Sequence, residues 1–358
     1  MSIDYFSTYM LRAAVEEIQP EKFFFRDRYF PTTAADIFNT DKVLVEYKKG
    51  NRKIAAFVSD RSNPIPLERT GYKVHEFEPP KISMSRSLTI DDLKKRGFGE
   101  AIYSNTTPAE RAVRLMVNDF TDLDLTISRR EEWMCAQTMI NNGCTVQEYV
   151  DAKTKGAAYD ILFYEGDSSP HIYTVGIPWN SKGANVIGDI HAMCRLLAML
   201  GLNAADLVIG TDVEDVFYQD ESIARMLDKN SGIVFGEINE RIDYPGIATL
   251  GNGPFNIKGF KLRIFVASTT YENENGVNTP YFPKDGAMVS FPKCGHLMYG
   301  RDTHIPYGQK DPVDFTGKRI PKLIIDQKND VRELDLISHP LAVPAVYCPY
   351  IFAGKVVS

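Results

Sequence analysis

The sequence predicts an α+β protein that is organised around one long helix. Between Thr107 and Gly143 lie 35 residues with no glycine and with proline only at the first position. Strand-like hairpins are predicted on both sides of this stretch, at 42–58 and 145–164. Residues 187–292 alternate helical and strand patterns, which is typical of an α/β domain inserted into a longer chain.

The long helix has clear start and stop signals. Thr107 is a typical N-cap, Pro108 suits the first helical position and Glu110 completes a capping box. Gly143 is the residue type that most readily takes the left-handed conformation ending a helix. At 1.5 Å per residue the helix would be about 52 Å long, and the weak helix formers at 121–126 predict a bend near its middle. Apolar residues predict one buried stripe, which is interrupted at Arg130: Ala109, Val113, Met116, Phe120, Leu123, Ile127, Trp133, Met134 and Ile140.

A helix about three times the usual length fits two architectures. It can be a coiled coil or a long helix that crosses one large domain. It can also be the backbone of a flat, elongated subunit whose other parts reach its neighbours. The length alone favours neither architecture.

The composition is that of an ordinary soluble globular protein, with 358 residues, 44% hydrophobic and 25% charged. This length predicts two domains or one domain with insertions. The net charge of −6 argues against general nucleic-acid binding through a basic surface. No run of 18 apolar residues and no signal-peptide layout occurs, so we expect synthesis inside the cell and no membrane partner. Scattered cysteines predict buried free thiols: Cys135, Cys144, Cys194, Cys294 and Cys348.

The segment before the long helix holds an aromatic cluster and a projecting β arm. Residues 2–18 have the spacing of a short amphipathic helix, and Phe23–Pro31 follows with arginines among its rings. Such a cluster can stack on single-stranded bases, or it can dock its rings into a partner or its own core, which we favour. A hairpin is predicted at 42–58 with a basic tip at Lys48–Lys53. Residues 42–90 as a whole would be a β arm that needs a partner surface.

After the long helix the sequence predicts a second hairpin, from Thr145–Ala152 and Tyr159–Tyr164. Within 187–292 we expect helices at Ile187–Met199 and Asp212–Phe217, with strands at 206–210, 262–266 and 287–291 between and after them. The tail from Gly300 onward is rich in strand patterns and bends near Ser338–Pro344. We expect this tail to pair with the second hairpin in a sheet that packs on the long helix.

A search for catalytic chemistry finds no site. Gly251-Asn252-Gly253-Pro254 places a proline where a phosphate-binding loop needs a backbone donor. Asp189, His191 and Cys194 could be imagined as metal ligands, but their spacing fits an amphipathic helix start better. The acidic run 212–215 suits a helix N-terminus. The histidines form no motif with a serine or cysteine, so we expect no enzyme and no catalytic, cofactor-binding or metal-binding residue.

Several motifs in order resemble one known family, the lambda-type major capsid proteins of tailed bacteriophages with the Hong Kong 97-type coat fold. Phe24–Pro31 resembles the family's "LFFRESYPF"-like segment, and Gly71–Pro80 resembles the end of its extended loop. Trp179 with Gly188-Asp189-Ile190 is similar to the entry into its inserted domain. Tyr271–Val289 is similar to its "YVENG…FLPDNTMV" hairpin, and Leu336–Leu341 to its "MIQSAPL" ending.

The resemblance implies an α+β Hong Kong 97-type architecture with an N-terminal arm, an extended β loop, a peripheral domain and an axial domain. The boundaries implied are 1–39 for the arm, 40–92 for the loop, 93–186 with 293–358 for the peripheral domain, 108–142 for its spine helix, and 187–292 for the axial domain.

The resemblance also implies a function. The protein would self-assemble into hexamers and pentamers of an icosahedral head around double-stranded DNA, without sequence-specific DNA binding. Separate scaffold, portal and decoration proteins are the expected partners, with the virion and, during assembly, the host cytoplasm as locations. We expect the basic tip to lie over a neighbour's acidic residues. The candidates for contacts between subunits are Phe24, Phe25, Arg26, Arg28, Lys48, Lys49, Arg52, Lys53, Asp122 and Asp124.

Three other readings remain open at this point. A tail-tube or other phage structural protein is the nearest alternative, although tube proteins lack so long a spine helix. An encapsulin-like compartment shell would share the fold. An unrecognised enzyme is the third.

Overall fold

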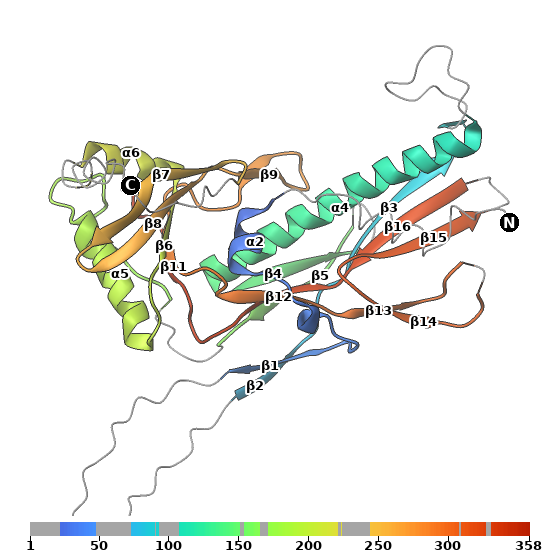
Figure 1. Cartoon of the computed structure of the whole chain (residues 1–358), viewed down its shortest axis with the longest axis horizontal. Helices are drawn as coiled ribbons and strands as arrows, with labels where there is room; N and C mark the ends of the chain where they lie inside the picture. Colours follow the sequence, from blue (N-terminus) through green and yellow to red (C-terminus); the bar gives the residue numbers. More distant parts are fainter. Residues whose placement is uncertain are drawn as a thin grey trace, which may run out of the picture. The chain divides into compact units, whose positions relative to one another are not determined.

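The computed structural model describes ten stretches of the chain, which fall into two compact units (Figure 1). The first unit lies within residues 1–43, 78–137 and 296–342, and the second within 44–77, 138–295 and 343–358. The described residues are 22–47, 73–89, 91–92, 107–150, 154–164, 171–220, 223, 244–307, 309–326 and 331–358. The predicted helix at 2–18 and the basic tip at Lys48–Lys53 lie outside them.

Helix α4 is the predicted long helix and spans Pro108–Asn141, 34 residues without interruption. The capping box is confirmed, because the backbone N–H of Thr107 donates to Glu110 Oε2 at 2.9 Å and that of Glu110 donates to Thr107 Oγ1 at 3.3 Å. The predicted stop is wrong by one residue. Asn142, with φ of 58°, takes the left-handed conformation, and Gly143 begins the next strand.

Gly143 nevertheless has to be glycine. Its φ is 153°, and a Cβ built there would lie 1.9 Å from the carbonyl oxygen of Ile161. The position therefore needs the small residue for the close approach of two strands and not for the helix stop that the sequence predicts.

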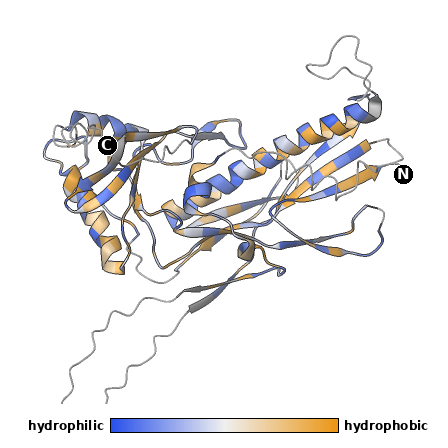
Figure 2. Cartoon of the chain, viewed as in Figure 1, coloured by the Kyte–Doolittle hydropathy of each residue, from blue (hydrophilic) through white to orange (hydrophobic). Residues whose placement is uncertain are grey.

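One face of α4 packs on a three-stranded antiparallel sheet within the first unit. The sheet has the order β15-β16-β3, from Ile320–Asp326, Val331–Ser338 and Ile82–Thr89. Figure 2 shows hydrophobic and hydrophilic residues alternating along α4, as expected for a helix with one buried face. The predicted stripe is confirmed at its centre by a buried cluster: Met116, Phe120, Leu123 and Ile127 against Leu323, Leu334 and Leu336.

The predicted partner of the tail is wrong. Strand β16 pairs with β3 along its whole length, from Val331 opposite Thr89 to Ser338 opposite Ile82. The second hairpin, β4 (Gly143–Tyr149) and β5 (Lys155–Leu162), is a separate two-stranded sheet. The tail thus completes its sheet with a strand from the segment before α4, and Ile82 of β3 packs against the buried cluster under the helix.

Two further short strand pairs include residues of the tail. Strand β12 (Gly295–Tyr299) pairs with β17 (Pro340–Pro344), and β13 (Arg301–His304) pairs with β14 (Val313–Thr316). The bend predicted within 338–344 is confirmed, since β16 ends at Ser338 and β17 starts at Pro340.

The second unit holds a five-stranded mixed sheet in the order β18-β11-β6-β8-β7. Strand β6 (Asp206–Gly210) runs parallel to β8 (Phe260–Ala267), and the other pairs are antiparallel. The remaining strands of the sheet are β7 (Ile247–Ile257), β11 (Ala287–Ser290) and β18 (Ile351–Ala353). The glycine-rich run at 251–254 lies inside β7, where the register shifts, and is therefore an irregular strand rather than a phosphate loop.

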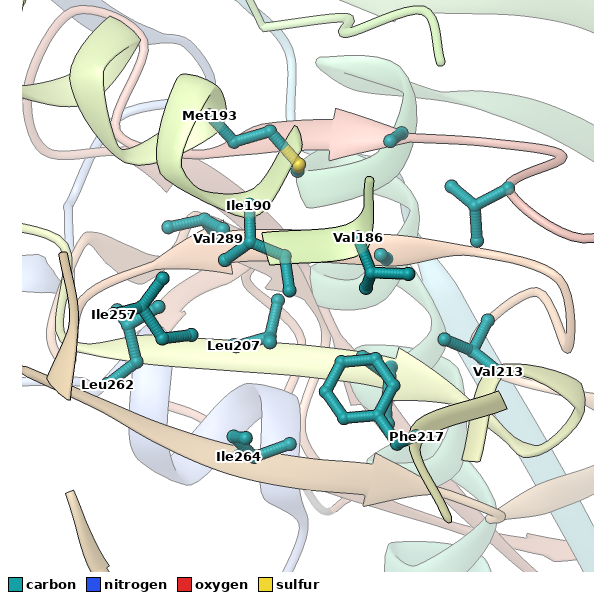
Figure 3. Packing of buried hydrophobic residues seen from close by; sticks show 14 of the residues in the cluster. Val186, Ile190, Met193, Leu207, Val213, Phe217, Ile257, Leu262, Ile264 and Val289 are labelled. Atoms are coloured by element: carbon teal, nitrogen blue, oxygen red, sulfur yellow. The ribbon is translucent and has the colours of Figure 1, made fainter. Parts of the chain in front are cut away.

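Two helices cover one face of this sheet, α5 (Val186–Leu200) and α6 (Thr211–Gln219). Figure 3 shows Val186, Ile190 and Met193 of α5 packed over Leu207 and Val289 of the sheet. The alternation of helices and strands predicted for 187–292 is thus present, and its core is formed by every second residue of the strands.

Two small hairpins lie outside this core. Strands β9 (Thr270–Glu272) and β10 (Asn278–Pro280) pair at the start of the segment 271–289 that resembles the family's hairpin. Strand β1 (Val43–Tyr47) pairs with β2 (Lys73–Phe77) in the described part of the arm. The partner that the sequence predicts for β1, at 54–58, lies outside the described residues.

Candidate functional site

The aromatic cluster before the arm forms a short helix, α2 (Phe24–Tyr29), in the first unit. Phe24 and Phe25 expose 2% and 0% of their surface, and the Phe24 ring meets Phe25 and Tyr29 edge to face at 5.1 and 5.5 Å. Rings buried in this way cannot stack on nucleic-acid bases. The Phe24 and Phe25 rings dock onto the protein's own core, which is one of the alternatives that the sequence left open.

A carboxylate of α4 holds the start of α2. The backbone N–H groups of Phe25 and Arg26 donate to the two oxygens of Glu132 at 2.8 and 2.7 Å. The preceding residue, Phe23, has no polar side-chain atom that could cap the helix. Glu132 is 2% exposed and therefore acts as a cap supplied from a distant part of the chain.

The neighbouring Glu131 is the centre of a buried ion-pair network. Its oxygens accept from Arg319 Nη1 at 2.6 Å and Nη2 at 3.1 Å, from the Tyr299 hydroxyl at 3.1 Å and from Arg26 Nη1 at 3.3 Å. Arg319 Nε also donates to Asp124. Two arginines and a tyrosine from three distant segments thus meet one carboxylate on α4, which fixes the register of those segments on the helix.

The pKa values of the two adjacent glutamates are shifted in opposite directions. Burial acts to raise the pKa of Glu131, but the Arg319 and Arg26 guanidinium groups outweigh it, so its pKa is lowered and it stays ionised. Burial raises the pKa of Glu132 to about 7, and the two backbone N–H donors oppose this only in part. The two pKa values differ because Glu131 binds two cations directly, whereas Glu132 binds uncharged amides.

We expect Glu132→Gln to change how stability depends on pH. Glu132 binds a proton more tightly when folded, so its contribution to stability is full below the ordinary carboxyl pKa and is lost as pH rises through about 7. The free energy of unfolding of wild type minus that of the variant should therefore be about 3 kcal/mol larger at pH 4.5 than at pH 8.

Urea unfolding of the unassembled subunit at several pH values measures this difference. Groups other than Glu132 titrate in both proteins and cancel. Parallel pH profiles for the two proteins would contradict the expectation.

The other candidate contact residues are placed as follows. Asp122 shares the Arg86 guanidinium with Asp119, at 2.9 Å to each carboxylate, and 60% of its side chain is exposed. Asp124 is bound by Arg319 and only 16% of its side chain is exposed. The Arg28 guanidinium lies 6.0 Å from the centre of the Tyr29 ring. Arg26 and Asp124 therefore meet in the Glu131 network, whereas Asp122 belongs to a separate, more exposed pair.

Glu131, Glu132, Arg319 and Tyr299 were not singled out from the sequence. One signal was present, because Glu131 follows Ile127 by four residues and precedes Met134 by three, on the apolar stripe of α4. A charged residue on a buried stripe needs a partner. Nothing local to the sequence indicates that the partners are Arg26 and Arg319.

The residues considered as metal ligands form structural contacts in the second unit. Asp189 accepts from the Tyr173 hydroxyl and from Trp179 Nε1, both at 2.9 Å, and Cys194 is fully buried in the core under α5. Asp189 therefore ties the segment before α5 to the first turn of that helix. Among the described residues, no cluster of three or more His, Cys, Asp or Glu side chains is arranged to hold a metal ion.

A second polar cluster lies around Asp302 in the first unit. Lys81 Nζ and His304 Nδ1 approach its carboxylate at 2.8 Å, and His339 Nε2 approaches it at 3.2 Å. The contact with His339, together with those of Lys81 and His304, holds the pKa of Asp302 well below its usual range despite burial. This cluster joins the start of β3, the β13 strand and the bend after β16.

Comparison with known proteins identifies the family. Residues 7–349 match the model of the family described as phage major capsid protein E. The chain belongs to this capsid protein family. It is a structural protein of a phage capsid, and its fold is the Hong Kong 97-type coat fold. No described helix of this capsid protein combines the length and apolar character that a membrane span requires.

Solved structures support the fold of the capsid protein. It is similar, with a TM-score of 0.66 and 13% identity, to a protein assigned as the capsid protein of a prophage of Escherichia coli CFT073; the match covers 98% of this chain and 99% of the other. It is also similar to a phage-related protein of Bordetella bronchiseptica RB50, with a TM-score of 0.50, 9% identity and 97% of each chain covered. The search of curated proteins found no match.

Proposed function

We propose that copies of this capsid protein assemble into hexamers and pentamers that close an icosahedral shell around double-stranded DNA. The observation that carries the proposal is the family match over residues 7–349, which includes both units. Rings of identical subunits need contacts between different surfaces of the same chain. The protein then acts through its surfaces, without catalysis, a cofactor or sequence-specific DNA contacts.

The side of α4 that faces away from the sheet supports the proposal. Leu125 lies on this side and is partly exposed, and Arg114 and Asp122, which are exposed, lie on or beside it. A helix side that carries an apolar residue among exposed charged residues is available to contact a neighbouring subunit.

The roles that we propose for the separate parts of the chain follow the family architecture. The arm would make contacts between subunits, and the extended loop would lie over a neighbour. A separate scaffold, a portal and decoration proteins would be the other partners, with assembly in the host cytoplasm before the virion is complete. The proposed parts are an arm at 1–39, a loop at 40–92, a peripheral domain at 93–186 and 293–358, and an axial domain at 187–292.

Sedimentation and negative-stain microscopy of the purified protein test the proposal. Closed shells of tens of nanometres are expected. Tubes would instead support a tail protein, and a small soluble oligomer would contradict assembly. Shells that copurify with a cargo enzyme would support a compartment shell in place of a phage head.

We further propose that the basic tip at Lys48–Lys53 lies over the acidic side of a neighbour's α4. Of the two carboxylates considered, Asp122 is more available, because Asp124 is already bound by Arg319. Replacing Lys48, Lys49, Arg52 and Lys53 with glutamate would place like charges together and should lower particle yield about tenfold.

Particle yield and the temperature at which particles break measure this effect. Two reversals in the tip, Lys48→Glu and Lys49→Glu, are matched by Lys155→Glu and Lys182→Glu at exposed positions elsewhere. Normal yield and heat resistance from the tip variant would rule out this contact.

A further inference from the structure

The five-stranded sheet of the second unit carries opposite charges at its two ends. One end, which we call the basic end, holds three exposed lysines: Lys258, Lys261 and Lys293. The other, the acidic end, holds Asp212 and Asp215, which are exposed, and Glu214 and Asp285, which are partly exposed. This separation is not visible in the sequence, where the residues of the two ends are interleaved.

Strand register places these residues at opposite ends. Strand β8 runs parallel to β6, with Asp206 opposite Arg263 and Gly210 opposite Ala267. Lys258 and Lys261 lie at the turn that begins β8, so they are at the start of β6. Helix α6 begins at Thr211, directly after the last residue of β6, so its acidic first turns lie at the far end.

The neighbouring strand gives the same assignment. Strand β11 is antiparallel to β6, with Ser290 opposite Asp206 and Ala287 opposite Ile209. Lys293 follows the end of β11 and therefore lies at the basic end, while Asp285 precedes its start and lies at the acidic end. Five strand residues at 3.3 Å each separate the two ends by about 16 Å.

These charges are not neutralised by ion pairs within the described part of the subunit, although Asp212 and Glu214 lie in the first turn of α6. Within the described part of the chain, none of the three lysines and none of Asp212, Glu214, Asp215 and Asp285 forms an ion pair. Lys284 and Lys355 also lie at the acidic end and are exposed. Lys182 is also near this end, because the backbone N–H of Trp179 donates to Val356 and that of Val356 donates to Asp285. Among the described residues, four carboxylates against three lysines leave this end slightly negative.

An exposed apolar side chain accompanies the basic end. Helix α5 ends at Leu200, and only residues 201–205 connect it to the start of β6. Its last turns are therefore near the basic end, and Met199 exposes 68% of its surface there. The ring of His191, earlier on the same helix, lies 5.7 Å from that of Phe260, the first residue of β8.

We propose that the basic end of one copy docks on the acidic end of the next copy, head to tail. This inference rests on the proposed assembly of many copies. Contact between two basic ends or two acidic ends would oppose like charges, so complementarity selects the head-to-tail arrangement. A contact between two different surfaces of the same chain can repeat around a closed ring, whereas a contact of like with like stops at a dimer.

Charge reversal tests the proposal. The basic-end variant carries Lys258→Glu and Lys261→Glu, and the acidic-end variant carries Asp212→Lys and Asp215→Lys. Each should lower the yield of sedimenting particles about tenfold, because each opposes like charges at every contact. The swapped variant, with all four changes in one chain, has complementary ends again and should return to within about twofold of wild type.

Mixing separates loss of contact from loss of folding. The basic-end variant has two acidic ends and the acidic-end variant has two basic ends. Neither should form rings alone, but an equimolar mixture should form six-membered rings in which the two chains alternate. A five-membered ring cannot alternate two chains without one contact between like charges, so the mixture should give hexamers and not closed shells. Lys155→Glu with Lys310→Glu is the matched control and should assemble normally, because both lysines are exposed and neither belongs to the two ends. Circular dichroism establishes that each soluble variant is folded.

Each result has a defined meaning. Wild-type yields from folded end variants, or a swapped variant that fails to assemble together with a mixture that forms no rings, would overturn the head-to-tail contact. Wild-type protein that forms no particles would instead overturn the proposed assembly. Rescue by the swap together with ring formation by the mixture would establish the contact.

Discussion

Replacing Arg319 with methionine is expected to lower the free energy of unfolding of the subunit by about 3–5 kcal/mol. The Arg319 side chain is 9% exposed and that of Glu131 is 0% exposed. Glu131 would keep only Arg26, at 3.3 Å, as a cationic partner. Methionine fills much of the space of the arginine stem, so the loss measures the uncompensated carboxylates of Glu131 and Asp124 and not a cavity.

A second substitution distinguishes the charge from other effects. Glu131→Gln in the Arg319→Met background removes the more deeply buried of the two carboxylates that lose Arg319 and leaves an acceptor for Arg26 and Tyr299. The double variant should therefore be more stable than Arg319→Met alone. Arg301 is the matched control, since it bridges Asp41 and Asp314 at the surface and Arg301→Met should cost much less stability than Arg319→Met. Equal losses for Arg319→Met and Arg301→Met in urea unfolding would contradict the special role of the buried network.

Phe217→Ala is expected to destabilise the subunit by about 3–5 kcal/mol, because it leaves a cavity in the core between α6 and the sheet. Phe217 is 1% exposed, and its ring lies 6.2 Å from that of Trp179. Figure 3 shows it beside Val213 over the strands of the second unit. The loss of this ring should loosen α6 first, because the helix has only nine residues and is held by this face.

The next residue is the control. Tyr218 exposes 60% of its surface, so Tyr218→Ala should change the free energy of unfolding by about 0.5 kcal/mol or less. Thermal unfolding of the two variants measures the contrast. Because α6 carries the acidic end, Phe217→Ala should also lower particle yield. Equal stability of the two variants would show that Phe217 does not anchor the helix.

Local sequence patterns predicted those elements that depend on residues close together in the chain. The capping box at Thr107, the stripe from Met116 to Ile127 and the bend after Ser338 depend on residues within one or two turns of each other. The pairing of the tail was missed, although Ile82–Thr89 alternates apolar and polar residues as a strand should. Such alternation indicates a strand but carries no information about its partner, and β3 and β16 are about 250 residues apart in the sequence.

The residues of the candidate site show the same limit of prediction from local sequence patterns. The sequence drew attention to Phe24, Phe25 and Arg26, but its reading of their role left the partner or the protein's own core open. The structure places both rings inside the core and Arg26 in the Glu131 network. The basic tip and its contact with a neighbour remain a prediction, because Lys48–Lys53 lie outside the described residues.

The sequence by itself determined the long helix, the order of the elements and, through its motifs, the membership of a phage capsid family. These features rest on periodicity, capping and local motifs, which involve residues close together in the chain. Only the tertiary structure decided that β3 completes the sheet under α4, that Glu131 and Glu132 hold distant segments, and that the second unit has a basic and an acidic end. These depend on strand register and on the burial of charge. Both are set by contacts between residues far apart in the sequence, where local patterns have no influence.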